Sequence, residues 1–175
     1  KTPLITIDPP DARDHDDAVW AAPDDDPANP GGFQTIVAIA DVATYVKPGS
    51  VLDKEARFRG NSVYFPDRVV PMLPERISND LCSLREKEDR PALACFMVFD
   101  KSGTKKSHRF ARAVMRSAAK LSYEEAQAAI DGRSNAKTDV LLEGVLKPLW
   151  KAYGALMKAR EKREPLELDL PERKL

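Results

Sequence analysis

The chain has 175 residues, 42% of them hydrophobic and 32% charged, which suits one domain with a core and a hydrated surface. Its 28 Lys and Arg residues balance 28 Asp and Glu residues. Long-range attraction to nucleic acid is therefore excluded, and a polyanion site must come from local clustering or from a metal. Two cysteines and two histidines provide neither a zinc set nor a dense disulfide framework, which favours a reduced, cytoplasmic chain.

Targeting signals are not found in the sequence. No apolar stretch approaches the roughly 20 residues of a membrane-spanning helix, and no signal peptide opens the chain, so no membrane partner is expected. Because Lys1-Thr2-Pro3 stands where an initiator Met is usual, the chain is expected to have been cut from something longer.

Short apolar runs bounded by turn residues predict the strands. Two prolines, Pro9 and Pro10, end the first run, and the Pro-, Gly- and Asp-rich residues 23–32 predict an exposed turn before the second. Residues 101–104 predict the turn of a hairpin between the last two runs. The predicted strands are residues 4–7, 33–40, 92–99 and 109–118.

Capping residues mark two of the predicted helices. Ser50 and Gly60 bound a helix over residues 51–59, and the Ser-x-x-Glu pattern from Ser122 opens a helix that ends near Asp131. Between them, residues 61–90 are rich in proline and irregular apart from a short helix over 75–81. Such a long connection is usually functional.

The longest helix is expected near the end of the chain. An i, i+3/i+4 apolar stripe runs from residue 139 to 162, with a kink expected at Pro148, and residues 166–170 alternate like a half-buried strand. Strands lead and helices trail, which predicts an α+β fold with a mixed or antiparallel, sheet-like or barrel-like core flanked by helices.

Four carboxylates follow the first predicted strand within ten residues: Asp8, Asp14, Asp16 and Asp17. Their mutual repulsion would raise their pKa values and destabilise the loop unless cations neutralise it. Carboxylate oxygen ligands, without Cys or His, select hard ions such as Mg²⁺, Mn²⁺ or Ca²⁺. Only a bent loop aims all four carboxylates at one centre. Chemistry on phosphodiesters is where carboxylate-held metal ions are most useful.

Other interpretations of the acidic residues remain open. The loop is also compatible with an exposed acidic turn, whereas an EF-hand is excluded because Val19 stands where the glycine belongs. Residues 24–26 are equally acidic but lie in a Pro/Gly turn, so we expect them to be solvated. His15 is expected to be exposed to solvent, with ligand binding or proton transfer as the alternative, and His108 and the two cysteines are assigned structural roles.

The pattern Ile7-Asp8, five residues, then Asp14-x-Asp16-Asp17-Ala18 resembles the signature of the RNase II/RNB exoribonuclease family. Convincing similarity extends over about residues 4–123, and the joint occurrence of several blocks is far more specific than the acidic loop alone. The further blocks that resemble this family in order and spacing are residues 39–42, 45–46, 52–56, 59–66, 71–74 and 78–84.

The resemblance implies a metal-dependent hydrolase that degrades RNA processively from a single-stranded 3′ end to nucleoside 5′-monophosphates. It implies Mg²⁺, with Mn²⁺ as the alternative, as the cofactor. Four aspartates match the metal ligands of the family, and one of them, Asp16, matches the aspartate on which the chemistry depends. A tyrosine, Tyr64, matches one that lies beside the 3′-terminal nucleotide, where a flat ring stacks on any base. The implied metal ligands are Asp8, Asp14, Asp16 and Asp17.

Departures from the family pattern bear on activity. Family members carry arginines and an acidic residue in the second half of the catalytic domain, as well as cold-shock and S1 domains, and none of these is found here. Residues 1–175 are therefore expected to be the N-terminal part of an RNB domain, with the missing C-terminal part as a partner. The alternative is a noncatalytic RNA-binding or interaction module derived from such a domain.

Two further expectations concern charged residues outside the loop. Six arginines lie between residues 57 and 90, and their acidic neighbours make surface ion pairs the expected role for most of them, with RNA phosphates as the alternative. Asp41 follows a predicted strand, where it is either a partner of the site residues or a turn former.

Overall fold

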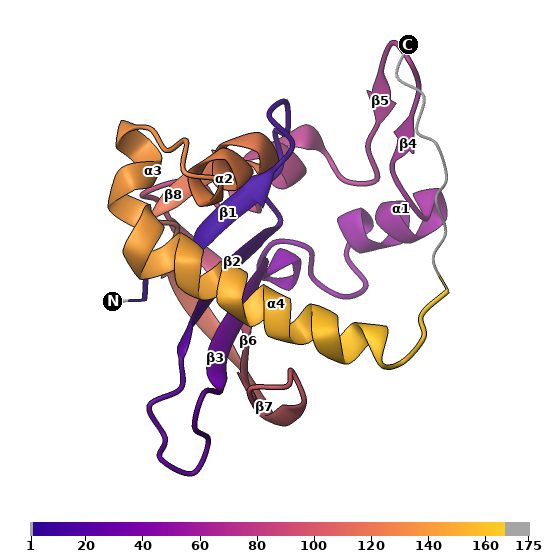
Figure 1. The fold of residues 1–175 in the computed structure, drawn as a ribbon. Helices are drawn as coiled ribbons and strands as arrows, with labels where there is room; N and C mark the ends of the chain where they lie inside the picture. Colours follow the sequence, from indigo (N-terminus) through magenta and orange to yellow (C-terminus); the bar gives the residue numbers. More distant parts are fainter. Residues whose placement is uncertain (1, 167–175) are drawn as a thin grey trace.

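Six strands of the computed structural model, which describes residues 2–166, form one sheet in the order β7-β6-β3-β2-β1-β8 (Figure 1). All neighbouring pairs are antiparallel except β1 and β8, which are parallel. With helices on the sheet, this confirms the predicted α+β class. The strands are β1 (Ile5–Asp8), β2 (Asp17–Pro23), β3 (Phe33–Ala40), β6 (Asp89–Phe99), β7 (Lys105–Arg116) and β8 (Ala119–Ser122).

Alternation along the strands divides the core between the two faces of the sheet. On one face, Ile5 of β1 and Leu121 of β8 are fully buried against Leu146, and α4 (Lys147–Glu161) lies across the sheet (Figure 1). On the other face, Ala38 of β3 and Leu84 belong to a second buried cluster. This second cluster includes Ile77, Cys82 and Leu84, so the segment that precedes β6 is anchored to the sheet.

The β6–β7 hairpin is longer than predicted, because pairing begins directly beside its turn. One oxygen of Asp100 accepts hydrogen bonds from the backbone N–H groups of Ser102 and Thr104, each at 2.9 Å. This closes the turn tightly enough for Phe99 to pair with Lys105, after which the ladder continues to the far end of both strands.

Capping signals placed the short helices correctly. The Ser50 hydroxyl accepts from the backbone of Asp53 and opens α1 (Val51–Arg59), and Gly60 ends it with a φ of 79°. The predicted capping box of Ser122 and Glu125 is present at the start of α2 (Tyr123–Ile130). Residues 76–81 form the short helical segment that was expected there, as a π-helical turn (Arg76–Leu81).

The helix predicted over residues 139–162, with a kink at Pro148, is present as an uninterrupted helical segment over 136–161, but a π-helical turn divides it into three pieces. The pieces are α3 (Ala136–Leu141), a π-helical turn (Leu142–Leu146) and α4. Pro148 lies in the first turn of α4, where its missing N–H costs nothing, and the break therefore precedes the proline. The strand expected at 166–170 falls almost entirely outside the described residues.

A second, two-stranded sheet stands apart from the first. It consists of β4 (Val63–Tyr64) and β5 (Val69–Val70), joined by a turn in which the Phe65 N–H donates to the carbonyl of Arg68 at 2.8 Å. A short 3₁₀ turn (Val42–Thr44) and α1 lead from β3 toward this hairpin. Among the residues that the structure describes, no helix is long and apolar enough to span a bilayer.

Candidate active site

The acidic loop connects two adjacent antiparallel strands. Asp8 is the last residue of β1 and Asp17 the first residue of β2, so the loop reverses direction at one edge of the sheet. The Ala12 N–H donates to the carbonyl of Pro9 at 3.0 Å, which makes the turn. The bent loop that the four aspartates were expected to require is therefore present.

One cavity of about 780 Å³ collects the residues predicted for the site. Asp8, Asp14, Asp16 and Asp17 line it from the acidic loop, and Tyr64 lines it from the β4–β5 hairpin, about fifty residues further along the chain. The structure therefore brings together all five residues that the sequence singled out. The other lining residues include Arg13, Ser62, Asp67, Arg68, Glu75, Ser78 and Asn79.

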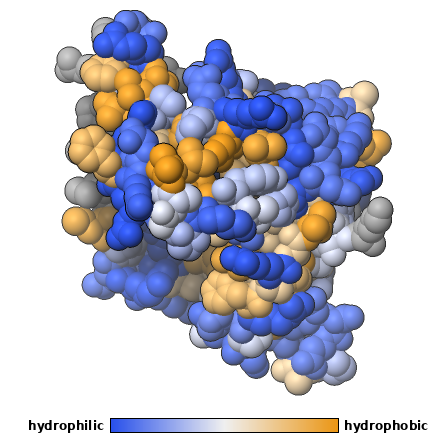
Figure 2. Space-filling model, turned by 180° about the vertical axis from the view of Figure 1, so that it is seen from behind, coloured by the Kyte–Doolittle hydropathy of each residue, from blue (hydrophilic) through white to orange (hydrophobic). Residues whose placement is uncertain are grey.

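The hairpin that carries Tyr64 presents apolar side chains to solvent. Tyr64 is 73% exposed, and its neighbours Val63, Phe65, Val69 and Val70 are each at least 40% exposed. In the view from behind, hydrophobic side chains gather at the upper left, where this hairpin lies (Figure 2). An exposed apolar cluster of this kind is typical of a binding surface.

Partial burial, together with electrostatic repulsion within the acidic loop, raises two pKa values. Partial burial, followed by the charges of Asp14, Asp17 and Asp8, raises the pKa of Asp16 above its usual value of 3.8. Burial and the charge of Asp8 likewise raise the pKa of Asp17. The loop therefore favours a positive charge in the cavity, as its composition predicts.

The donor chemistry of the cavity fits a hard divalent cation, since it presents several carboxylate oxygens and no thiolate. Within residues 2–166, no three Asp, Glu, His or Cys side chains converge closely enough to hold an ion by themselves. A Mg²⁺ site in a phosphate-processing protein typically uses one or two carboxylates, with water and substrate phosphate oxygens completing the shell. The observed carboxylates satisfy this smaller requirement.

His15 is buried, so the expectation that it is exposed is wrong. It is 4% exposed, and its Nδ1 lies 2.8 Å from Oδ2 of Asp8. Its backbone N–H donates to the Ser83 hydroxyl at 3.2 Å, and its carbonyl accepts from the N–H of Leu84 at 2.8 Å. These bonds to a segment that belongs to the buried core explain why a histidine in an acidic loop is drawn inside.

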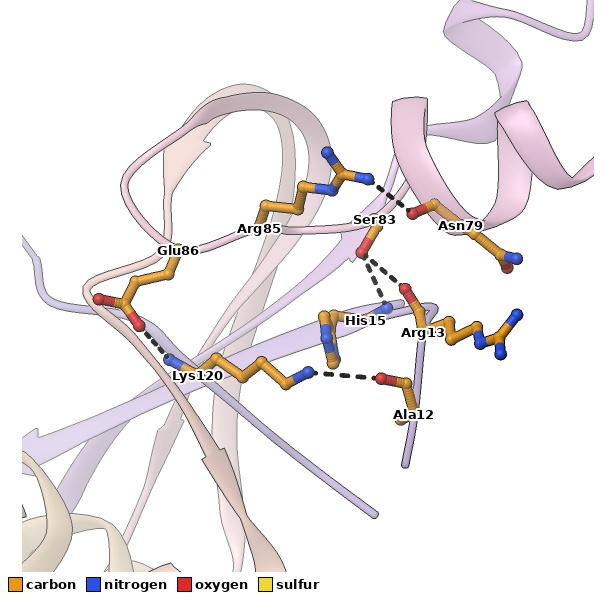
Figure 3. A pocket seen from close by; sticks show the side chains of 8 residues that line it. All are labelled: Ala12, Arg13, His15, Asn79, Ser83, Arg85, Glu86 and Lys120. Atoms are coloured by element: carbon orange, nitrogen blue, oxygen red, sulfur yellow. Dashed lines mark hydrogen bonds between the residues drawn. The ribbon is translucent and has the colours of Figure 1, made fainter. Parts of the chain in front are cut away.

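A second cavity of about 550 Å³ lies beside the first and shares Ala12, Arg13 and Asn79 with it (Figure 3). Lys120 of β8 lines this second cavity, and its Nζ donates a hydrogen bond to the carbonyl of Ala12 at 3.3 Å. Sequence reasoning missed Lys120, because only the parallel pairing of β1 with β8 brings it to the acidic loop. The remaining lining residues are His15, Ser83, Arg85 and Glu86.

Ion pairing is the observed role of four of the six arginines between residues 57 and 90, as expected. Their acidic partners are Glu55 for Arg59, Asp67 for Arg68, Asp80 for Arg85, and Glu88 and Asp80 for Arg90. Arg68 also lies 5.0 Å from the ring centroid of Phe65 and lines the candidate cavity. Asp41, whose role was left open, pairs with Arg112 at 3.3 Å.

Residues 24–26 do not line the candidate cavity, although Asp24 is more than a solvated acid. Asp24 accepts hydrogen bonds from the side-chain amides of Asn29, at 2.7 Å, and Gln34, at 2.9 Å, and these bonds lower its pKa. Its role is to hold the turn before β3 in shape. The expected structural roles of the cysteines are compatible with the buried, free thiol of Cys82.

Comparison with known proteins establishes the family. The chain belongs to the RNB domain family, because the family's sequence model matches residues 1–175. It is 46% identical over 173 residues to ribonuclease R of Vibrio parahaemolyticus and 43% identical over 173 residues to ribonuclease R of Escherichia coli. Each alignment covers 98% of this chain but only 20% and 21% of the relative, so the chain spans about a fifth of their length. The blocks that resemble the family also predict a likeness to bacterial ribonuclease R in particular, and this is confirmed.

Solved structures share the fold. Mycoplasma genitalium ribonuclease R in complex with double-stranded RNA matches with a TM-score of 0.84 and 34% identity, over 93% of this chain and 28% of that one. Yeast Ssd1, described as a pseudonuclease, matches with a TM-score of 0.73 at 18% identity, over 93% of this chain and 18% of its own. The second match shows the fold alone.

Proposed function

We propose that this chain is the N-terminal part of the catalytic domain of a 3′-to-5′ exoribonuclease, which degrades RNA processively to nucleoside 5′-monophosphates in the cytoplasm. The observation that carries the proposal is the single cavity lined by Asp8, Asp14, Asp16, Asp17 and Tyr64. Membership of the RNB family and the likeness to ribonuclease R support it. The remaining part of the domain would supply the basic and acidic residues that complete the site.

Asp8, Asp14 and Asp17 would supply the carboxylate ligands of Mg²⁺, or Mn²⁺, one or two to an ion, with water and substrate phosphate oxygens completing the shell. When bound, the metal supplies activation of a water molecule and stabilisation of the leaving oxygen of a phosphodiester. Asp16 would hold and orient the attacking water from the same loop. It is the residue on which hydrolysis is proposed to depend most.

Tyr64 would position the RNA rather than take part in bond cleavage. Tyr64 is largely exposed and lines the same cavity as the acidic loop, so a 3′-terminal base is free to stack on its ring. Stacking on an aromatic ring does not distinguish bases, which suits an enzyme that must process any sequence. A single-stranded 3′ end is therefore the proposed substrate.

The alternative, a noncatalytic RNA-binding module, has one observation in its favour: the same fold occurs in a pseudonuclease. The fold alone therefore does not establish activity, and the aspartates must be tested. A chimera in which residues 1–175 replace the matching segment of Escherichia coli ribonuclease R supplies the rest of an RNB enzyme around this cavity. The 43% identity over 98% of this chain makes the exchange practicable.

The chimera is expected to release nucleoside 5′-monophosphates from a 5′-labelled single-stranded RNA in the presence of Mg²⁺ and to stop when EDTA is added. The parent enzyme is the control for activity under the same conditions. RNA retention that EDTA does not affect, without release of monophosphates, would support the noncatalytic module instead.

A further inference from the structure

His15 is held in place on three sides within the acidic loop. Its backbone is bonded to Ser83 and Leu84, and its ring nitrogen Nδ1 is 2.8 Å from Oδ2 of Asp8. Because a carboxylate only accepts hydrogen bonds, Nδ1 carries the hydrogen and donates it. The side chains of His15 and Asp8 are 5% and 12% exposed, so water competes little for this bond.

His15 and Asp8 line different cavities. Asp8 lines the cavity of the acidic loop, whereas His15 lines the neighbouring cavity with Ser83 and Lys120 (Figure 3). In the neighbouring cavity, Lys120 donates from Nζ to the carbonyl of Ala12, and Glu86 accepts from the backbone N–H of Lys120; neither side chain is hydrogen-bonded to Asp8. Within the part of the chain that the structure describes, His15 supplies the side-chain donor to this carboxylate.

We infer that His15 is a positioning residue, which fixes the carboxylate of Asp8 so that its second oxygen is directed to a divalent cation in the cavity. This inference rests on the proposed function, because it assumes that Asp8 is a metal ligand. One oxygen of Asp8 is occupied by the Nδ1–H bond, and Oδ1 is left for the cation. Hydrogen-bond partners of this kind orient metal ligands, and their loss typically weakens metal binding about 10–100-fold.

The geometry also explains why this bond is hard to replace. Asp8 is the last residue of β1 and pairs with Ser122 of β8, so strand pairing restrains its backbone. Only rotation of its side chain remains free, and the bond to His15 fixes that rotation. Without the donor, the carboxylate would lie 8% exposed among three other acids with nothing to orient it.

Two substitutions separate the hydrogen bond from the packing of the ring. His15→Phe keeps a flat ring but removes the donor, whereas His15→Asn loses ring volume but keeps an N–H donor near the position of Nδ1. The dissociation constant of Mn²⁺ is measured on the 175-residue chain from the electron paramagnetic resonance signal of the free ion, and Tm is measured alongside. We expect His15→Phe to weaken Mn²⁺ binding about tenfold and His15→Asn to stay within about threefold of the wild type.

A packing role predicts the opposite order, with His15→Phe close to the wild type, and that result would overturn the inference. Equal weakening by both variants would also overturn it. If the wild-type chain itself binds no Mn²⁺, the proposed metal dependence fails and the inference fails with it. If the wild type binds Mn²⁺ and His15→Phe binds it equally well, the inference fails alone. Asn29→Leu is the matched control, because Asn29 is 5% exposed and donates to Asp24 at 2.7 Å in the other acidic turn. It should lower Tm without changing the Mn²⁺ constant.

A measurement on the wild type keeps the test independent of how the variants fold. The Nδ1–H proton of His15 should exchange slowly with solvent and give its own nuclear magnetic resonance signal. Saturating Mg²⁺ should shift that signal, since the proton is bonded to a metal ligand. A signal unchanged by Mg²⁺, in a chain whose Tm the ion raises, would contradict the inference.

Discussion

The backbone N–H of Ala40 donates a hydrogen bond of 2.9 Å to the carbonyl of Asp16. Ala40 ends β3, and Asp16 immediately precedes β2, so this bond extends the ladder between the two strands into the acidic loop. The backbone of Asp16 therefore belongs to the sheet, while its side chain is exposed toward the cavity. A substitution that keeps the size of this side chain should change its charge and little else.

Asp16→Asn should raise the Tm of the metal-free chain at pH 7 by ~1–3 °C, the effect of one partly exposed charge. The reason is that burial and the neighbouring carboxylates raise the pKa of Asp16, so its ionised form opposes folding. Differential scanning calorimetry measures this. Asp25→Asn, in the turn outside the cavity, should leave Tm unchanged.

The gain in Tm of Asp16→Asn over the wild type should shrink as the pH falls. Because the folded-state pKa of Asp16 lies above the unfolded value of 3.8, the folded chain binds the proton more tightly, and its stability falls as the pH rises through this window. The difference between wild type and Asp16→Asn should therefore disappear below about pH 3.8. A lower Tm for Asp16→Asn at pH 7 would contradict this account of the loop.

Mg²⁺ or Mn²⁺ at millimolar concentration should raise the Tm of the wild-type chain, because the ion binds the folded state and relieves repulsion in the loop. At a concentration one hundred times the dissociation constant, the stabilisation is about 2.7 kcal/mol. Asp8→Asn should reduce the shift. An unchanged Tm in both ions would leave a preformed metal site in this chain without support.

Tyr64→Ala should change the length of the final RNA product of the chimera with Escherichia coli ribonuclease R. Phosphate contacts hold the strand generally, whereas stacking at the 3′ end, worth about 1–3 kcal/mol per base, determines which phosphodiester reaches the aspartates. Tyr64→Phe retains the ring and should resemble the wild type. Gel analysis of a digested single-stranded RNA shows both, and an unchanged product and rate with Tyr64→Ala would assign this tyrosine to the structure of the hairpin alone.

Gly103→Ala should destabilise the fold by roughly 2–4 kcal/mol, from backbone strain together with overpacking. Gly103 has a φ of 80°, and a Cβ atom there would lie 2.2 Å from the carbonyl oxygen of Ala155 in α4. Gly49 has a similar φ of 75° but open space around it, so Gly49→Ala should cost only the backbone term, about 1 kcal/mol. Urea unfolding of the two variants separates packing from strain, and equal losses would argue against the tight contact of the turn with α4.

Local signals explain what was predictable from the sequence. The Ser122 capping box and the Ser50 and Gly60 boundaries depend on residues within one turn of each other, and all were found where expected. The acidic loop was also recognisable, because its four aspartates lie within ten residues after a strand. Its convergence with Tyr64 was foreseeable only through the resemblance to a family.

Long-range contacts explain what was not predictable. The burial of His15 depends on Ser83, which is 68 positions away, and no periodicity in the loop indicates this contact. Lys120 reaches Ala12 across 108 positions through strand pairing. Pro148 made an irregularity in the last helix predictable, but the apolar stripe did not indicate that it would be a π-helical turn over Leu142–Leu146.

The most direct test of the proposed function is the rate at which the chimera carrying Asp16→Asn releases nucleoside 5′-monophosphates from a single-stranded RNA in Mg²⁺. We predict a fall of about 1,000-fold or more relative to the unsubstituted chimera, because loss of several kcal/mol of transition-state stabilisation corresponds to such a factor. The affinity for the RNA should stay within about threefold, since the backbone of the loop is unchanged. Turnover by Asp16→Asn within about tenfold of the unsubstituted chimera would contradict the assignment of this cavity as the active site.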